Sequence, residues 1–195
     1  MLSYKESLKI LKETNALLEG HFILSSGLHS NQYIQCAKLL SHPKKAQLIC
    51  KSLSEKISGI YKNIDLILSP AIGGIVIGYE IGRQLQIKTI FSERFNNKLM
   101  LRRGFEITPN SNVLIVEDVI TTGKSVLECF DIVRTNKANL LGYACIIDRS
   151  NSTSKIKSSI VSQIKLQIDT FDENKLPDYL KKIKAIKPGS RELSK

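Results

Sequence analysis

The chain has 195 residues, a length that supports one good hydrophobic core and is short for two. No apolar run approaches the roughly 20 residues of a membrane span, and the N-terminus lacks the basic start and apolar stretch of a signal peptide. The formal net charge is +11, but the basic residues are spread along the chain and are not interleaved with aromatic ones. We therefore expect a protein without a membrane or nucleic-acid partner, with most of its lysines in solvent.

Cysteine usage indicates the compartment. Cys36, Cys50, Cys129 and Cys145 are widely spaced, and no Cys-x-x-Cys pair occurs. This spacing predicts reduced thiols in a cytoplasmic protein and argues against a zinc site.

In chain order, the hydrophobic pattern predicts alternating helices and strands. We expect helices at 3–19 (ended by Gly20), 43–57 (opened by Pro43), 74–85, 125–136 and 173–185. We expect strands at 64–68, 89–91, 113–117, 141–147 and 163–171. Such alternation implies an α/β fold with an open, mostly parallel sheet, flanked by helices that make right-handed crossovers.

The segment 113–125 carries most of the functional information. Apolar residues Val113 to Val116 suit a buried parallel strand, which ends in the adjacent carboxylates Glu117 and Asp118. A tight turn and a helix start follow, and such a turn offers free backbone N–H groups to a phosphate. The candidate phosphate-binding residues are Val119, Ile120, Thr121, Thr122, Gly123, Lys124 and Ser125. The acidic pair can accept hydrogen bonds from a diol, and the turn after it can bind a phosphate. A phosphorylated ribose offers both groups and therefore fits the segment.

Two other interpretations fit part of this segment. A nucleoside-triphosphate P-loop also closes in Gly-Lys-Ser, but it requires glycine where Asp118 stands, and a carboxylate there would face the phosphates. A plain turn and helix cap would explain the threonines and glycine. It does not explain the paired acids directly after an apolar strand.

Residues 117–125 resemble the phosphoribosyl-diphosphate motif of the type I phosphoribosyltransferases, and the chain is most similar to the branch that acts on orotate. Supporting matches, in the expected order, are 69–74, 92–94, 101–105 and 148–150. The resemblance implies the fold of that family as a single domain, 1–195, with a small N-terminal hood over the base formed by residues 20–40. It also implies transfer of ribose 5-phosphate to orotate with Mg²⁺ as cofactor, and a homodimer with shared active sites.

The resemblance assigns roles to individual residues. It implies that Glu117 and Asp118 hold the ribose hydroxyls, that Asp118 and Lys98 are catalytic, and that Arg149 binds the carboxylate of orotate. Arg94 joins Lys98 in a basic loop, 94–109, that would close over pyrophosphate in the neighbouring subunit. Arg102 and Arg103 are helpers or partners of Glu93 or Glu106. The pyrophosphate loop comprises Ala71, Ile72, Gly73 and Gly74, and no protein side chain is expected to bind the metal directly.

The chain departs from the family pattern at two positions, since Gly73 and Ser25 stand where lysine is common. Two alternative functions stay open. One is a type I phosphoribosyltransferase for a purine or uracil. The other is a non-enzymatic regulator that senses phosphoribosyl diphosphate and binds nucleic acid.

Overall fold

The computed structural model describes residues 1–24, 26–150 and 154–188. Its main sheet has six strands in the order β5-β4-β3-β6-β7-β8. These strands are β3 (Leu66–Pro70), β4 (Thr89–Phe95), β5 (Lys98–Leu101), β6 (Asn112–Ile120), β7 (Asn139–Asp148) and β8 (Ile160–Lys165). All neighbours pair in parallel except β4 and β5, which form an antiparallel hairpin. The expected open, mostly parallel sheet is confirmed.

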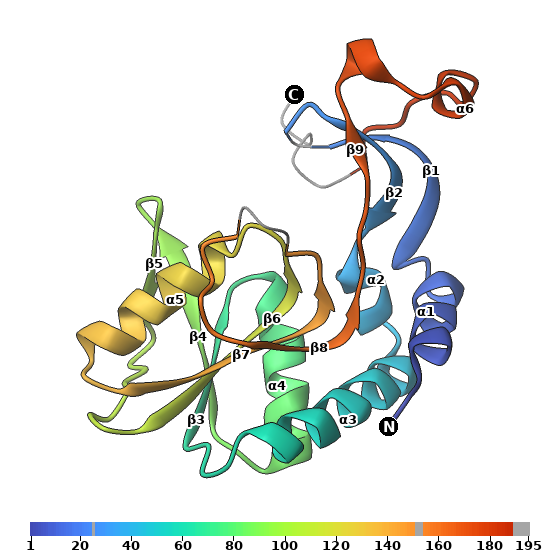
Figure 1. Cartoon of the computed structure of the whole chain (residues 1–195). Coiled ribbons are helices and arrows are strands. Elements are labelled where there is room, and N and C mark those ends of the chain that lie inside the picture. The colour runs from blue at the N-terminus through green and yellow to red at the C-terminus, as the bar shows by residue number, and fades with distance from the viewer. Residues whose placement is uncertain (25, 151–153, 189–195) are drawn as a thin grey trace.

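Helices cover both faces of this sheet (Figure 1). They are α1 (Tyr4–Glu13), α2 (Cys36–Leu40), α3 (Pro43–Ile60), α4 (Gly73–Leu85) and α5 (Lys124–Thr135). Strand β6 shows why helices must cover both faces of the sheet. Leu114 and Val116 belong to the core that contains the buried residues of α3 and α4, whereas Val113 and Ile115 belong to the core that contains those of α5. The unbroken apolar run in the sequence reflects burial on both faces.

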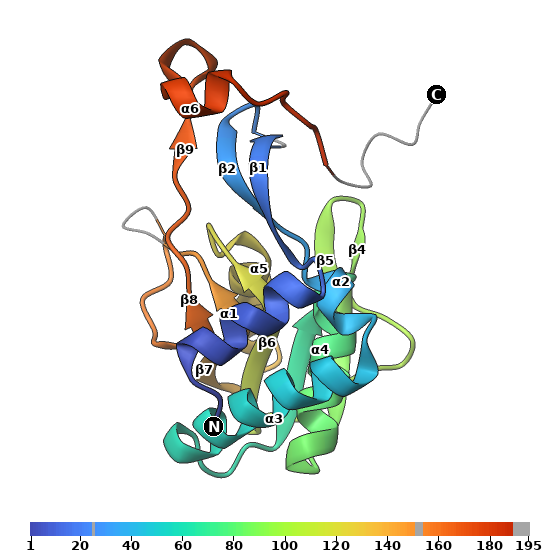
Figure 2. The same ribbon diagram turned by 90° about the vertical axis from the view of Figure 1, so that its right-hand side faces the viewer.

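A second, three-stranded sheet forms the hood, in the order β1-β2-β9. It consists of β1 (Leu17–Ile23), β2 (His29–Ile34) and β9 (Thr170–Phe171). Figures 1 and 2 show it on the side of the main sheet that carries the turn between β6 and α5. The C-terminal segment fastens the hood, since the N–H of Ile23 donates to the carbonyl of Ile186 at 2.8 Å and the N–H of Ile186 donates to that of His21 at 2.8 Å. The hood therefore combines the two ends of the chain.

Several sequence-based boundaries were wrong. The first helix ends at Glu13, not near 19, because Asn15 adopts a left-handed conformation (φ 54°) and Leu17 and Leu18 pair with β2. Gly20 therefore lies within β1 and ends no helix. The expected strand 163–171 is divided between β8 and β9, which belong to different sheets.

The last helix is much shorter than 173–185. It is reduced to a 3₁₀ turn, Glu173–Lys175, and the four-residue α6, Asp178–Lys181. Pro177 separates them, because proline holds Leu176 in an extended conformation and itself serves as the N-cap of α6.

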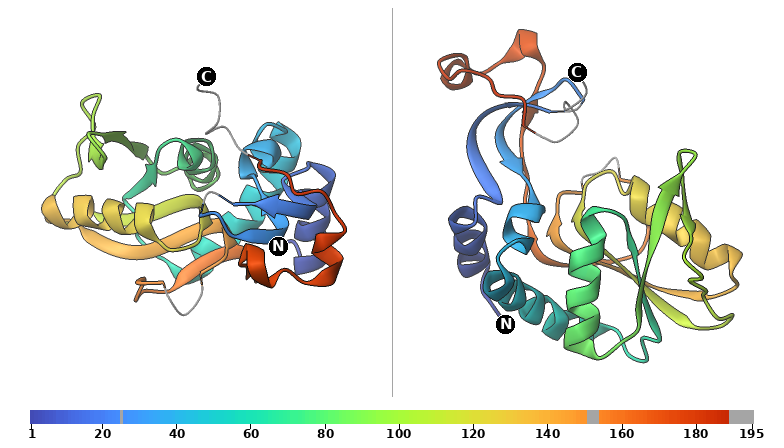
Figure 3. Two further views of the ribbon diagram at one scale, coloured as in Figure 1. Left: turned by 90° about the horizontal axis from the view of Figure 1, so that it is seen from above. Right: turned by 180° about the vertical axis from the view of Figure 1, so that it is seen from behind.

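The basic segment 94–109 is also more ordered than a loop. Its first part is the β4–β5 hairpin, in which Arg94 pairs with Leu99 and Phe95 with Lys98. Figure 3 shows this hairpin beside α5 at the edge of the main sheet. No helix among the described residues has the length and apolar character to cross a membrane.

Candidate active site

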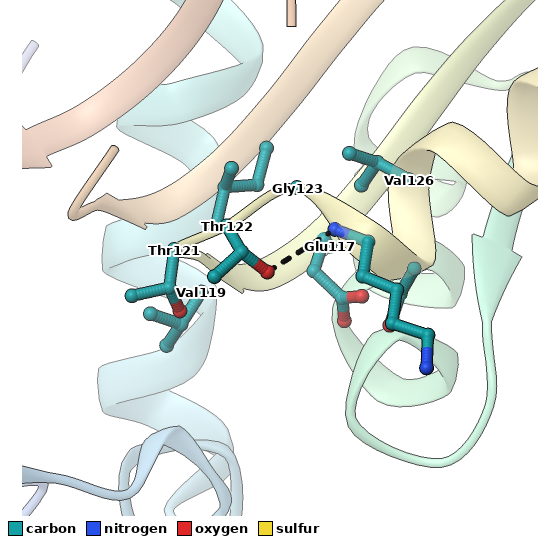
Figure 4. Close-up of a pocket in the computed structure, with 9 residues that line it drawn as sticks. Glu117, Val119, Thr121, Thr122, Gly123 and Val126 are labelled. Atoms are coloured by element: carbon teal, nitrogen blue, oxygen red, sulfur yellow. Dashed lines mark hydrogen bonds between the residues drawn. The ribbon is translucent and has the colours of Figure 1, made fainter. Parts of the chain in front are cut away.

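The turn between β6 and α5 forms an open pocket of about 80 Å³, lined by Glu117 and residues 119–126. Gly123 begins the helix with φ 80°, a conformation that side chains disfavour. The Thr122 hydroxyl accepts a hydrogen bond from the N–H of Lys124 at 3.4 Å, and it lines the pocket together with the Glu117 carboxylate (Figure 4). In the described part of the chain, the N–H groups of Thr121, Thr122 and Gly123 have no acceptor. These features make the pocket suited to an anion.

Burial of the acidic pair changes its ionisation. Glu117 is 8% exposed, and desolvation together with the nearby Asp118 raises its pKa to about 9. Desolvation also raises the pKa of Asp118, although the N–H of Val119 donates to its Oδ1 at 2.8 Å and favours the charged form. Without a ligand, the pair therefore retains a proton at neutral pH. A group that offers hydroxyl donors or a cation would favour the ionised form.

The loop after β3 approaches the same carboxylate. A Cβ atom at Gly73 would lie 2.9 Å from both carboxylate oxygens of Asp118, and one at Gly74 would lie 3.2 Å from the carbonyl of Val116. Ala71 is fixed by its N–H, which donates to the carbonyl of Ser92 at 2.8 Å, while Ile72 is 86% exposed. The structure thus brings the loop 71–74 against the acidic pair. At position 73, where the family often has lysine, the glycine leaves the Asp118 carboxylate directly against the loop backbone.

Arg149 follows β7, the strand next to β6. Its N–H donates to the carbonyl of Ile120 at 2.8 Å, which places it beside the start of the phosphate turn. The Asp148 carboxylate accepts the N–H of Ser150 at 2.8 Å and so shapes this turn. The guanidinium Nε of Arg149 is buried and has no hydrogen-bond partner among the described residues, and desolvation lowers the pKa of the group. A guanidinium whose Nε is buried without a partner is suited to an anionic ligand.

The hairpin cations differ in their contacts. Arg94 forms an ion pair with Glu128 of α5 at 3.0 Å, and Arg103 forms one with Glu93 at 2.7 Å. Arg102 lies 3.9 Å from the same Glu93. Lys98 is exposed and has no ion pair in the part of the chain that the structure describes. The pairing of Arg102 and Arg103 with Glu93 was one of the expected alternatives, whereas Glu128 was missed because its sequence context gives no sign of it.

A metal site made by the protein alone would need more ligands than the pocket offers. Within residues 1–24, 26–150 and 154–188, no group of three or more His, Cys, Asp and Glu side chains is placed to hold an ion.

The four cysteines are buried free thiols. Ser25, the second departure from the family pattern, lies outside the described residues.

Comparison with known proteins decides the family. The model of the phosphoribosyl transferase domain matches residues 35–181. Orotate phosphoribosyltransferase of Chlorobium phaeobacteroides is 47% identical over 185 residues, covering 95% of both chains. The chain belongs to the orotate phosphoribosyltransferase family. The enzyme of that name from Caldanaerobacter subterraneus is 41% identical, over 95% of this chain and 97% of that one.

Solved structures of phosphoribosyltransferases confirm the fold. Orotate phosphoribosyltransferase from Aeropyrum pernix aligns with a TM-score of 0.68 and 24% identity, covering 81% of this chain and 92% of that one. An adenine phosphoribosyltransferase aligns with a TM-score of 0.64 and 16% identity, covering 80% and 99%. Because enzymes for different bases share the architecture, the base must be read by particular side chains.

Proposed function

We propose that the chain transfers the ribose 5-phosphate group of phosphoribosyl diphosphate to orotate, giving orotidine 5′-monophosphate and pyrophosphate for pyrimidine nucleotide (UMP) synthesis. One observation carries the choice of base: the buried, unpaired Nε of Arg149 beside the phosphate turn. A guanidinium fork matches a carboxylate in geometry and charge. Orotate carries such a carboxylate, and the common purines and uracil do not.

The remaining residues suit the other parts of the substrate. The free N–H groups and hydroxyls of residues 119–125 would hold the 5′-phosphate, and Glu117 and Asp118 would accept hydrogen bonds from the ribose hydroxyls. The loop 71–74 would hold the diphosphate. As the C1–O bond to pyrophosphate loosens, the ribose becomes cationic, and N1 of orotate attacks from the opposite face while its proton passes to water or to the departing pyrophosphate. The protein contributes position and charge, and no covalent intermediate is required.

Magnesium fits this arrangement as an ion bound together with the diphosphate. Mg²⁺ usually keeps several waters and binds substrate phosphates, so the ion would be held by the diphosphate and the ribose hydroxyls near Glu117, with no protein side chain as a direct ligand. When bound, the ion would neutralise charge on the leaving pyrophosphate. Lys98 and Arg94 of the hairpin would add to this charge stabilisation.

We further propose a homodimer in which the hairpin of one subunit serves the site of the other. Ile72, Val76 and Tyr79 lie along one side of α4 and are 86%, 50% and 66% exposed. Apolar side chains at this spacing suit contact with a second copy. Residues 1–195 would act as one phosphoribosyltransferase domain, and the buried free thiols suit the cytoplasm.

Consumption of orotate in the presence of phosphoribosyl diphosphate and magnesium tests the proposal. Parallel reactions contain adenine, hypoxanthine or uracil in place of orotate. We expect pyrophosphate release only in the reaction that contains orotate as the base. Turnover of another base in its place would assign the chain to a different branch of the family, and binding of phosphoribosyl diphosphate without turnover would favour a regulator.

A further inference from the structure

The β4–β5 hairpin is docked on α5 through a side chain to which the chemistry above assigns no role. Strand β5 is an edge strand, so alternate N–H groups face away from β4. The N–H of Leu99 is one of these, and it donates to Oε2 of Glu128 at 3.2 Å. Leu99 itself is 7% exposed and packs in the same core as Val126 and Cys129 of α5. Glu128 therefore satisfies an edge amide that would otherwise have no partner.

The same carboxylate holds Arg94 from the opposite strand. Nη1 of Arg94 lies 3.0 Å from Oε2 of Glu128, and Nη2 donates to Oε1 at 3.3 Å. Nη1 also donates to the carbonyl of Asn97 at 2.7 Å, in the turn of the hairpin. One carboxylate thus connects both strands of the hairpin to the helix that begins at the phosphate turn. A bidentate contact of this kind restricts orientation as well as distance.

Lys98 is the residue whose position depends on these contacts. It precedes Leu99 and is exposed, and its side chain has no ion pair or hydrogen bond among the described residues. Its ammonium group is free to bind an anion, while the backbone on its C-terminal side is fixed by Glu128. Arg94, in contrast, is already neutralised.

We propose that Glu128 is a positioning residue for the reaction, which fixes the hairpin on α5 so that Lys98 reaches the leaving pyrophosphate. This inference rests on the proposed function and adds Glu128 to it. In this proposal Glu128 acts through the hairpin and does not contact the substrate. Its contribution is preorganisation, because a hairpin held before the reaction has less freedom to lose when Lys98 engages the developing charge.

Kinetic measurements on Glu128→Ala and Asp131→Ala test the proposal. Asp131 lies three residues further along α5, and its ion pair among the described residues is with the exposed Arg134, at 2.8 Å, so it controls for loss of a carboxylate from this helix. We expect Glu128→Ala to lower kcat about 10-fold with the orotate KM unchanged, since a small misplacement of a charged group costs at least this much. Glu128→Gln should recover most of the loss, because its amide oxygen can still accept from Leu99. Asp131→Ala should match the wild type.

A double-mutant cycle separates positioning from general stability. If Glu128 acts through Lys98, Glu128→Ala should change kcat less than 2-fold in a Lys98→Ala background. Equal losses in both backgrounds would overturn the proposal, as would wild-type kcat in Glu128→Ala. Hydrogen exchange at the Leu99 amide supplies a readout without activity, and we expect faster exchange in Glu128→Ala but not in Asp131→Ala. Unchanged exchange would overturn the docking role, whereas an inactive wild type would refute the proposed function instead.

Discussion

At the scale of single residues, Arg149 is the side chain on which the choice of substrate depends. Its Nε is buried without a protein partner among the described residues, so an orotate carboxylate would gain a contact in a poorly solvated place. We expect Arg149→Ala to cost about 2–4 kcal/mol of orotate binding. This corresponds to a rise in orotate KM of roughly 30-fold to 1,000-fold.

Steady-state kinetics with each substrate varied in turn measures this effect. The KM for phosphoribosyl diphosphate should change little in Arg149→Ala. Arg134→Ala, which removes a 70% exposed arginine from the end of α5, is the control. An equal loss of affinity for both substrates would show that Arg149 supports the site as a whole and does not recognise orotate.

Glu117 should make the stability of the ligand-free protein depend on pH. Burial raises its pKa from the ordinary value of 4.5 to about 9, so the folded chain keeps a proton that the unfolded chain loses. The stabilising effect of that proton is complete below about pH 4.5 and is lost as the pH rises through 9. We expect the melting temperature of Glu117→Gln to fall less than that of the wild type between pH 5 and pH 9.

Thermal unfolding at a series of pH values checks this expectation. Glu106→Gln, a change at an exposed carboxylate in the connection from β5 to β6, should leave the wild-type pH dependence in place. Parallel curves for the wild type and Glu117→Gln would mean that Glu117 ionises normally in the folded state. That result would contradict the interpretation that Glu117 and Asp118 retain a proton between them at neutral pH.

At the scale of elements, the packing of α4 on β3 sets the position of the loop 71–74. A Cβ atom at Gly78 would lie 2.1 Å from Oγ of Ser69, so the helix can approach the strand this closely only with glycine there. We expect Gly78→Ala to lower the free energy of unfolding by about 1–3 kcal/mol through overpacking.

Gly59→Ala is the matched substitution in a neighbouring helix. A Cβ atom at Gly59 of α3 meets nothing within 4 Å, so the change should stabilise the protein by up to about 1 kcal/mol. Chemical denaturation of both variants measures the two effects. A neutral Gly78→Ala would show that α4 can shift away from β3 without cost.

At the scale of the whole molecule, the proposed shared site can be tested with two damaged proteins. Lys98→Ala removes the hairpin cation, and Asp118→Asn removes a carboxylate that should be worth about 10²-fold in rate. If the hairpin acts on the neighbouring subunit, a hybrid dimer contains one intact site and one doubly damaged site. A fully exchanged equimolar mixture should then recover about a quarter of wild-type activity, since half of its dimers are hybrids.

If each hairpin serves its own subunit, every site in the mixture carries one lesion and no activity returns. Subunit exchange is followed independently, with differently tagged chains, so that a lack of mixing is recognised. A scrambled mixture that stays at the activity of the parents rules out the arrangement across the dimer. It leaves the roles of the acidic pair and Arg149 unchanged.

The sequence by itself determined the parts of this protein that depend on local pattern. The apolar run before Glu117 predicted a strand buried on both faces, followed by a turn and a helix, and all three are present, although the strand runs on to Ile120 and the turn is correspondingly shorter. The phosphate turn and the loop 71–74 follow from the same logic, because parallel strands bring their carboxyl ends to one edge. Arg149 required the family resemblance, since a lone arginine carries no local signal.

Which segments pair with one another depends on the three-dimensional arrangement of the chain. Leu17 and Leu18 continue a helical spacing, yet they join β1 because β2 offers backbone hydrogen bonds there. The basic segment after β4 folds back as a hairpin, and Glu128, 34 residues further along the chain than Arg94, fastens it. Periodicity describes one segment at a time, whereas these outcomes depend on contacts between segments far apart in the sequence.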